Sequence, residues 1–404
     1  MSDQSAKSSP PWPPIEYEAR PWEPRDAPLA SRTQQQRHSG PYQAAVPATI
    51  ARLPIELPSS VAAGAEDAAA EIARFDAELG REIAPYAAVL LRTESAASSK
   101  IENLTASARA IAEAELLPGG RPNATLIVAN ERAMTAAIEL ADRIDGDAVL
   151  SMHAALLGDT EPEIAGRWRD QPVWIGGGDL GPHGALFIPP HHDRIPAAMA
   201  DLMSFIERND VPVLAHAALA HAQFETIHPF PDGNGRTGRA LVHAQLRSKG
   251  LTRNVTVPVS AGLLTATDTY FRALTSYREG DYLAIIEQFA RAAFAAISNA
   301  RQLVEEIASV REGWDERISA RRDASVWRIA KLLLRRPVVN AAVIAAEFDI
   351  APHNVYRSLK PLVDAAVLVE FTAKRRYQMW RAPEVLDALD RFSARAGRRV
   401  RASG

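Results

Sequence analysis

Residues 228–239 read His-Pro-Phe-Pro-Asp-Gly-Asn-Gly-Arg-Thr-Gly-Arg, a glycine-rich loop that follows an apolar helical stretch. Pro229 disfavours helical geometry in the residue before it, so the apolar helix is expected to end at His228. The two glycines around Asn234 let the backbone turn sharply, and the N–H groups of this loop can converge on one point. A new helix begins near residues 235–236. The sequence therefore predicts a helix–loop–helix whose loop presents N–H groups at a helix N-terminus.

The residues in and beside this loop have the composition of a phosphate-binding site. A helix N-terminus with a glycine-rich entry binds phosphate through its exposed N–H groups and its dipole. Arg236 and Arg239 are three residues apart, so both can face the same anion. Asp232 can supply a hard oxygen ligand to a phosphate-bound magnesium ion, and His228 can act as a general base near neutral pH. The loop is not a Walker A motif, because the Lys-Ser/Thr ending is missing.

Composition restricts the classes of protein that remain. The chain of 404 residues has no cysteine, which excludes disulfides, thiolate catalysis and Cys-ligated metal sites. It has no apolar run of about 18 residues and no secretory h-region at its start, so we expect a cytoplasmic protein without a membrane partner. The net charge of −3 argues against a polycation that coats nucleic acid. Residues 301–404 nevertheless hold 20 Lys and Arg against 13 Asp and Glu, which suggests a separate basic unit.

The C-terminal quarter has its own order of elements. Apolar helices are expected at 326–334 and 341–348, a third helix at 352–366, and short strands at 367–372 and 376–380. Three helices followed by a hairpin are the winged-helix arrangement. Such modules bind DNA through a recognition helix, or serve as protein-interaction and dimer modules, and the sequence leaves both readings open.

The 228–239 segment resembles the signature of the Fic-domain (Fido) proteins, HPFx[D/E]GNGRxxR, with every fixed position matched. The usual activity of this family is AMPylation, the transfer of AMP from ATP to a protein hydroxyl with release of pyrophosphate. The resemblance therefore implies a protein adenylyltransferase that uses ATP as substrate and Mg²⁺ as cofactor. It also implies the all-α Fic fold with a β-hairpin flap. The target protein is not identified, and self-modification and a homodimer remain open.

The resemblance assigns a role to each position of the motif. His228 would deprotonate the Ser, Thr or Tyr hydroxyl of the target, and Asp232 would hold Mg²⁺ at the α- and β-phosphates. Residues 233–235 would form an anion-binding nest, Arg236 would contact the phosphates, and Arg239 would contact the γ-phosphate. The expected nucleotide-binding residues of the motif are Asp232, Gly233, Asn234, Gly235, Arg236, Thr237, Gly238 and Arg239.

A segment forty residues before the motif is similar to the flap of the family. Residues 185–190 read Ala-Leu-Phe-Ile-Pro-Pro and follow a Gly-, Trp-rich stretch, so we expect a hairpin or long loop here. The resemblance implies that this flap registers the target peptide by β-strand addition. The expected target contacts are Leu186, Phe187 and Ile188.

A segment after the motif resembles the helix that lines the adenine side. It contains Tyr270 and Phe271, which we include in the expected nucleotide-binding set. The family often has Tyr-Tyr and then Asn where this chain has Phe271 and Arg278. An ordinary amphipathic helix therefore remains an alternative for this segment.

Residues 98–103, Ser-Ser-Lys-Ile-Glu-Asn, fit the inhibitory-helix pattern [S/T]xxxE[G/N] of many Fic proteins. The spacing of Ser98 and Glu102 places them on one helix face. The resemblance implies that Glu102 pairs with Arg239 and occupies the γ-phosphate site, which leaves ATP in a non-productive pose. The expected inhibitory residues are Ser98, Glu102 and Asn103. In some relatives the same Glu positions water for the removal of AMP, so deAMPylation remains an alternative.

These observations predict an order of domains along the chain. We expect a mostly disordered N-terminal arm over 1–45, a helical region with the inhibitory helix over 46–118, a Fic core over 119–300, a linker helix over 301–321, and a winged-helix domain with a basic tail over 322–404. A second alternative function follows from the last domain, namely a DNA-binding regulator whose Fic site senses nucleotide.

Overall fold

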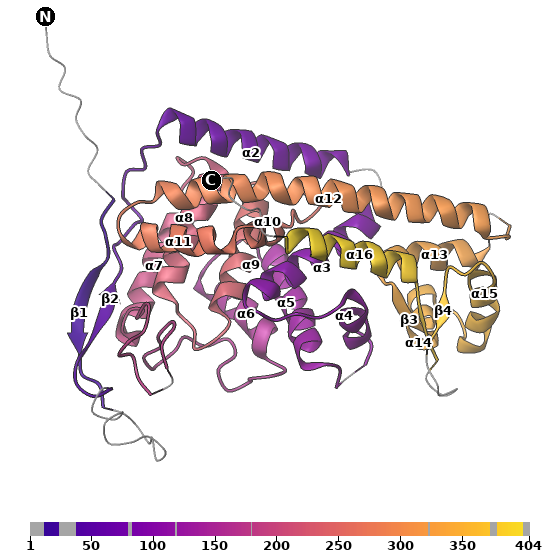
Figure 1. The fold of residues 1–404 in the computed structure, drawn as a ribbon, viewed down its shortest axis with the longest axis horizontal. Coiled ribbons are helices and arrows are strands. Elements are labelled where there is room, and N and C mark those ends of the chain that lie inside the picture. Colours follow the sequence, from indigo (N-terminus) through magenta and orange to yellow (C-terminus); the bar gives the residue numbers. More distant parts are fainter. Residues whose placement is uncertain are drawn as a thin grey trace, which may run out of the picture. The chain divides into compact units, whose positions relative to one another are not determined.

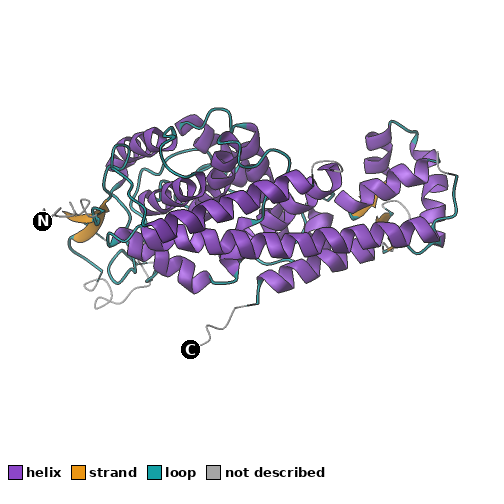
Figure 2. Cartoon of the chain, turned by 90° about the horizontal axis from the view of Figure 1, so that it is seen from above, coloured by secondary structure: helices purple, strands orange, loops and turns teal. Residues whose placement is uncertain are grey.

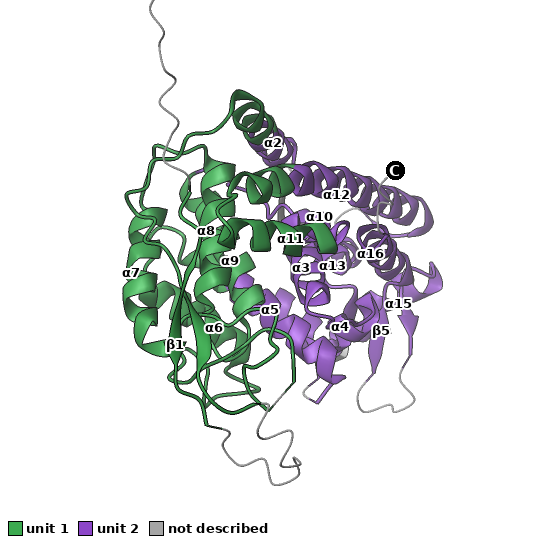
Figure 3. Cartoon of the chain, turned by 60° about the vertical axis from the view of Figure 1, so that its left-hand side comes forward, with its two compact units in different colours: residues 1–67, 136–249, 268–290 green, residues 68–135, 250–267, 291–404 purple. Residues whose placement is uncertain are grey.

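The computed structural model describes residues 12–23, 38–79, 83–117, 119–178, 180–321, 324–371 and 378–398. Helices make up most of these residues, and the strands are few and short (Figure 2), which confirms the expected mainly helical fold. No helix in these ranges is both long enough and apolar enough to cross a membrane. The chain packs into two compact units (Figure 3). Unit 1 comprises residues 1–67, 136–249 and 268–290, and unit 2 comprises residues 68–135, 250–267 and 291–404.

Unit 1 is built around the two helices that flank the motif loop. These are α8 (Val213–Ile227) and α9 (Asn234–Ser248), which pack against each other (Figure 1). From residue 214 onward every residue of α8 is buried, which explains its alanine-rich sequence. Helix α7 (Ile195–Ile206) packs on α8, and α6 (Gly146–Leu157) packs on α9. The motif loop is thus held by helices on both sides.

The N-terminal segment of unit 1 is ordered where the structure describes it. Strands β1 (Glu16–Arg20) and β2 (Tyr42–Val46) form an antiparallel pair. Trp12 is 5% exposed and packs its ring on Tyr277 and Tyr282, with ring centroids 5.5 and 4.8 Å away. The expectation of a mostly disordered arm is therefore wrong for residues 12–23 and 38–45, because burial of aromatic surface fixes them to their own unit. The rest of the arm lies outside the described residues.

A large core in unit 2 joins distant parts of the sequence. Its buried side chains run from Tyr86 and Val89 on α3 (Ile83–Ile101) to Leu386 and Leu389 near the C-terminus. The C-terminal segment therefore shares its core with helices that precede the motif by more than a hundred residues. The helices of this core include α4 (Ala108–Ala114), α10 (Val259–Leu264), α12 (Leu283–Arg317), α13 (Ser325–Arg335) and α16 (Pro383–Ala396).

Between α13 and α16 the C-terminal segment contains a small sheet. The three strands are antiparallel, in the order β3–β5–β4. Two helices precede the last two strands, as expected, and β3 was not expected. Residues 372–377, between the two expected strands of the hairpin, lie outside the described residues. The elements are β3 (Val338–Asn340), α14 (Ala341–Phe348), α15 (Pro352–Asp364), β4 (Val369–Glu370) and β5 (Met379–Arg381).

Three helices complete the order of elements in Figure 1. Helix α11 carries the segment expected on the adenine side, and α2 and α5 each contain residues of both units. Their bounds are α2 (Ser59–Glu78), α5 (Pro122–Glu139) and α11 (Thr267–Arg278).

Helix α3 ends inside the inhibitory pattern, at Ile101. Asn103 has φ of 63°, and its N–H donates to the Lys100 carbonyl at 3.0 Å. The N–H of Leu104 donates to the Ser99 carbonyl at 3.0 Å, which completes a Schellman motif. Asparagine is one of the few residues other than glycine that adopts this left-handed conformation readily, which explains the Gly-or-Asn position of the pattern.

Glu102 is the cap residue of this motif. Ser98 is fully buried, and Glu102 is exposed. Helix α3 ends at Ile101, one residue before Glu102.

Candidate active site

The backbone of His228 has an unusual conformation. Helix α8 ends there as predicted, and His228 has φ of 50° and ψ of 62°, in the left-handed region. This conformation is uncommon for residues other than glycine, and such strain concentrates at functional sites. Its N–H still bonds to the Phe224 carbonyl at 2.8 Å. The chain then leaves the helix sharply and enters the motif loop.

The side chain of Asn234 closes the loop from the inside. Its Oδ1 accepts from the Phe230 N–H at 2.9 Å, and its Nδ2 donates to the Phe230 carbonyl at 2.8 Å. Gly233 has φ of 77°, and a Cβ there would come within 2.9 Å of Leu156 on α6. Both residues therefore shape the loop. Because the side-chain amide of Asn234 is already bonded to backbone, only the backbone N–H of this residue can contact a phosphate.

Arg236 carries buried hydrogen-bond donors that have no partner. The residue is 4% exposed, and its Nη2 donates to Asp232 Oδ2 at 2.9 Å. Its Nε and Nη1 are buried without a hydrogen-bond partner, as is the hydroxyl of Thr237. Unpaired buried donors are rare and unfavourable in native proteins. A phosphate oxygen in the loop would satisfy them, which fits the predicted nucleotide site.

Asp232 fits the expected magnesium role. Its side chain is 56% exposed although it is bonded to Arg236. Among the residues that the structure describes, no group of three His, Cys, Asp or Glu side chains could hold a metal ion by itself. Magnesium is usually held by one or two carboxylates together with substrate phosphates and water. A single exposed carboxylate beside a phosphate cradle meets that requirement.

Gly238 and Arg239, further along α9, are also buried. Arg239 is 2% exposed, and its charge helps to lower the pKa of His221, whose pKa is lowered mainly by burial, to about 3. A Cβ on Gly238 would come within 2.8 Å of the Phe224 ring. Gly238 therefore lies where α9 comes closest to α8, and a side chain at this position would clash with the Phe224 ring.

The imidazole of His228 lies among charged groups. Its Nδ1 is 3.8 Å from Glu225 Oε2 and has no hydrogen-bond partner. Its pKa is lowered well below the ordinary value, first by burial and then by the positive charges of Arg169 and Arg278. The side chain is 19% exposed, so solvent reaches it. His228 is therefore neutral at physiological pH and able to accept a proton.

His153 on α6 supports the loop and is not recognisable from the sequence. Its Nδ1 accepts from the Gly166 N–H at 3.0 Å, so Nε2 carries the proton and donates to the Asp232 carbonyl at 3.0 Å. Its ring stacks on Phe230 at 3.7 Å. Burial lowers its pKa to about 4, which keeps it neutral. A single histidine in an ordinary helix, 75 residues before the motif, gives no signal of this role.

The flap is present as a minimal hairpin. The backbones of Ile175 and Phe187 pair in an antiparallel bridge, with the Ile175 N–H donating to the Phe187 carbonyl at 2.8 Å. Leu186 is 87% exposed, and the Phe187 ring is buried beneath the guanidinium of Arg278 at 3.7 Å. The carbonyl of Ile188 accepts from the Ala45 N–H of β2 at 3.0 Å. Of the three expected target contacts, Leu186 is the one that presents a large apolar surface to solvent.

The two aromatic residues on α11 have different positions. Tyr270 is 1% exposed, and its hydroxyl bonds to His221 Nε2 at 2.7 Å. Phe271 is 48% exposed. Tyr270 is thus a packed residue inside unit 1, and only Phe271 offers a ring to solvent. The neighbouring Arg278 was noted in the sequence only as a departure from the family pattern.

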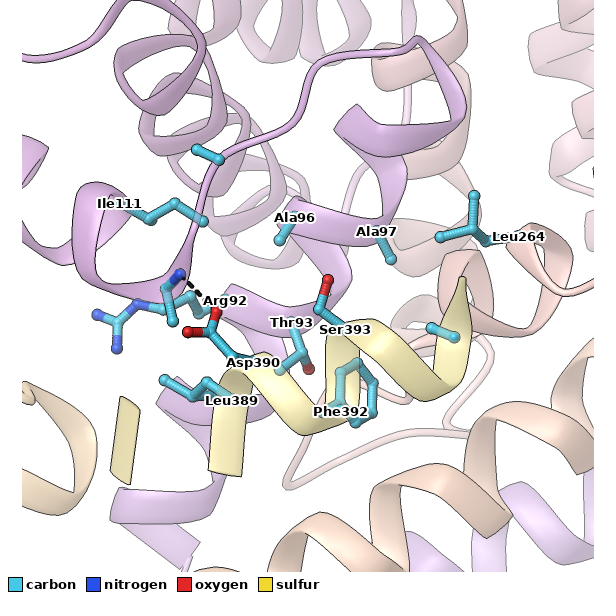
Figure 4. Close-up of a pocket in the computed structure, with 13 residues that line it drawn as sticks. Arg92, Thr93, Ala96, Ala97, Ile111, Leu264, Leu389, Asp390, Phe392 and Ser393 are labelled. Carbon is cyan, nitrogen blue, oxygen red and sulfur yellow. Dashed lines mark hydrogen bonds between the residues drawn. The ribbon is translucent and has the colours of Figure 1, made fainter. Parts of the chain in front are cut away.

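Ser98, Glu102 and Asn103 belong to unit 2, and their expected effect on Arg239 of unit 1 stays a prediction. Unit 2 also holds a pocket between α3, α4, α10 and α16 (Figure 4). Its polar groups are already used. Asp390 accepts from the Ala108 N–H at 2.9 Å and Arg92 bonds to Glu115. None of the predicted site residues lines it.

Comparison with known proteins identifies the region around this site. Residues 143–246 match the Fic/DOC family. Protein adenylyltransferase fic-1 of Caenorhabditis elegans is 30% identical to this chain over 112 residues, which are 27% of this chain and 20% of that protein. Protein adenylyltransferase Fic of Drosophila mojavensis is 35% identical over 109 residues, which are 25% of this chain and 19% of that protein. The match therefore spans about one fifth of the length of these curated relatives.

A solved structure shares the fold over a longer stretch. A Fic family protein from Desulfovibrio desulfuricans G20 aligns with 81% of this chain and 97% of its own, with a TM-score of 0.50 and 20% identity. At this identity the likeness concerns the fold alone. The family match, by contrast, contains His153, the flap and the complete loop motif. Over residues 143–246 this chain is therefore similar to the Fic/DOC family.

Proposed function

We propose that this protein is a protein adenylyltransferase that transfers AMP from ATP to a hydroxyl group of a target protein. The observation that carries the proposal is the combination of a neutral His228 with the unsatisfied buried donors of Arg236, the third residue of the next helix. The first is a proton acceptor and the second is a cradle for phosphate. The match to relatives named protein adenylyltransferase supports the same reaction.

In this reaction the target hydroxyl oxygen bonds to the α-phosphorus, and the bond from that phosphorus to the pyrophosphate leaving group breaks. His228 takes the hydroxyl proton. Arg236 and the N–H groups at the start of α9 hold the phosphates and stabilise the charge that develops on them. Asp232 would hold Mg²⁺, which neutralises phosphate charge when it is bound. His153 and Asn234 keep the loop in shape before substrate arrives.

We further propose that Glu102 holds the enzyme in an inhibited state. Its place at the cap of α3 is fixed by the Schellman motif around Asn103, so the position of the carboxylate does not depend on a flexible loop. Removal of this carboxylate is expected to raise the rate of transfer. The segment from α13 to β5 has the element order of a winged helix, and we propose that it is a winged-helix domain.

The test is intact-mass spectrometry of the Glu102→Gly protein with Mg²⁺ and ATP. A gain of one AMP group on the protein or on an added target, lost in the Glu102→Gly/His228→Ala double variant, supports the proposal. General-base removal is expected to slow transfer by at least about a hundredfold. Release of AMP from a modified protein without formation of an adduct would favour the deAMPylase alternative. Retarded DNA in a low-salt gel shift with the full chain, without either reaction, would favour the regulator.

A further inference from the structure

Arg169 is a buried arginine whose hydrogen bonds go to backbone carbonyls around His228. The residue is 3% exposed and lies just before the flap. Its Nε donates to the His228 carbonyl at 2.8 Å, and its Nη2 approaches the Ile227 carbonyl at 3.5 Å. Its own backbone N–H donates to the Pro229 carbonyl at 3.0 Å. One residue thus binds three consecutive carbonyls of the segment that carries the proposed general base.

The same guanidinium also holds both ends of the flap. Its Nη2 donates to the Pro190 carbonyl at 2.6 Å, where the flap returns, and its Nη1 donates to the Gln171 carbonyl at 3.0 Å, where the flap begins. No carboxylate forms an ion pair with Arg169 among the described residues. Its buried positive charge therefore has no opposite charge beside it, which is unfavourable unless the carbonyl dipoles stabilise it.

We propose that Arg169 is a positioning residue that couples the flap to the His228 loop and holds His228 ready to accept a proton. The proposal rests on the transfer reaction proposed above. The left-handed backbone of His228 needs such support, because strained conformations persist only where the surrounding structure over-determines them. The guanidinium of Arg169 is planar and rigid, so it can donate hydrogen bonds to several acceptors at fixed angles. The single ammonium group of lysine cannot do this.

Charge adds a second effect on the same histidine. Within the described part of the chain, the charged groups that face His228 are Glu225 from α8, Arg278 from α11 and Arg169 from the segment before the flap. Burial lowers the pKa of His228 most, and the Arg169 charge lowers it further. A protonated His228 cannot accept a proton. Loss of the Arg169 charge should therefore raise this pKa and move the acidic limb of the pH–rate profile toward higher pH.

The experiment compares three variants in the Glu102→Gly background, namely Arg169→Gln, Arg169→Lys and the matched control Arg167→Gln. Arg167 is exposed and lies two residues away. The pKa of His228 is followed by NMR of isotope-labelled histidine, with the resonance assigned by a His228→Gln variant. The turnover number kcat for adenylyl transfer is measured across pH. The first readout needs no transfer activity, so it stands even if the proposed reaction is not observed.

We expect Arg169→Gln to raise the pKa of His228 by about one unit and to lower kcat by about tenfold or more. Arg169→Lys should keep the pKa of His228 close to that of the parent. It should still lower kcat, because lysine cannot make the several hydrogen bonds to carbonyls that the guanidinium makes. A merely structural role would lower stability and kcat without moving the pKa. An unchanged His228 pKa in Arg169→Gln, or a kcat equal to that of Arg167→Gln, would overturn the proposal.

If Arg169→Gln does not fold, Arg169→Lys decides the question. The proposal then requires a lower kcat at a pKa of His228 close to the parental value, and a parental kcat would contradict it. If the parent protein transfers no AMP at all, the function proposed above is refuted, and kcat cannot be used as a readout. The NMR titration of folded Arg169→Lys and Arg169→Gln against the control then tests the link between Arg169 and His228 by itself.

Discussion

The amide of Asn234 holds the motif loop together before any nucleotide binds, and replacing it with alanine should therefore destabilise the free protein. The change removes two hydrogen bonds, of 2.9 and 2.8 Å, to the backbone of Phe230. Phe230 is fully buried, so its N–H and carbonyl cannot turn to water. Each buried group left without a partner costs about 1–3 kcal/mol. With two such groups, we expect the free energy of unfolding of unit 1 to fall by about 2–6 kcal/mol.

The assay is urea unfolding of the protein without ATP, combined with hydrogen exchange at the Phe230 amide. The matched control is Asn209→Ala, because Asn209 is exposed, and its loss should change stability by less than about 0.5 kcal/mol. If Asn234→Ala changes stability as little as the control, then Asn234 does not hold the loop. Its place in the motif would then have to be explained by contact with the nucleotide alone.

Two further predictions concern the cap of α3 and the buried histidines. Asn103→Val should raise transfer activity while Asn103→Gly leaves it unchanged, because valine resists the left-handed backbone by about 1–2 kcal/mol and glycine does not; equal rates of adduct formation in both variants would refute this. His153, with a pKa of about 4, stays neutral in the folded state but gains a proton in the unfolded chain below pH 6.5. Stability should therefore fall by about 3 kcal/mol between pH 6.5 and 4 from this group. In urea unfolding at several pH values, a His153→Gln variant should lose less stability over this range than the parent, and equal losses would contradict the assignment.

The motif loop was predictable because its chemistry is local. Pro229 and the glycines act within two turns of helix, so the end of α8 and the start of α9 follow from neighbouring residues. At the segment around residues 185–190, where a hairpin or long loop was expected, a hairpin is present as a single bridge.

The supporting residues were not predictable because they act over long sequence distances. His153 reaches Asp232 from 79 residues away, and Arg169 reaches His228 from 59 residues away. A histidine in a helix and an arginine in a loop look ordinary until the backbone brings them to the site. The place where the N-terminal segment packs could not be predicted for the same reason, since Trp12 packs on residues of α11 and beyond, far along the chain.

The break between α3 and α4 is hard to predict for a different reason. Helical spacing of apolar residues continues through 86–117, and that pattern hides the turn. The left-handed Asn103 and the cap formed by Ser107, whose hydroxyl accepts from the Ala110 N–H at 3.3 Å, end one helix and start the next. In a helical pattern, an Asn followed a few residues later by a Ser is a weak signal for a helix break. Asn103 was read as part of the inhibitory motif instead.

The central claim is that this site transfers an adenylyl group, and the position of a label in ATP tests it most directly. The Glu102→Gly protein is incubated with Mg²⁺ and ATP that carries radioactive phosphorus at either the α- or the γ-position, with a Glu102→Gly/His228→Ala control. The account predicts that label from the α-position becomes bound to protein and depends on His228, while label from the γ-position leaves with pyrophosphate. Protein-bound label from the γ-position, or α-label incorporation that survives the loss of His228, would contradict it.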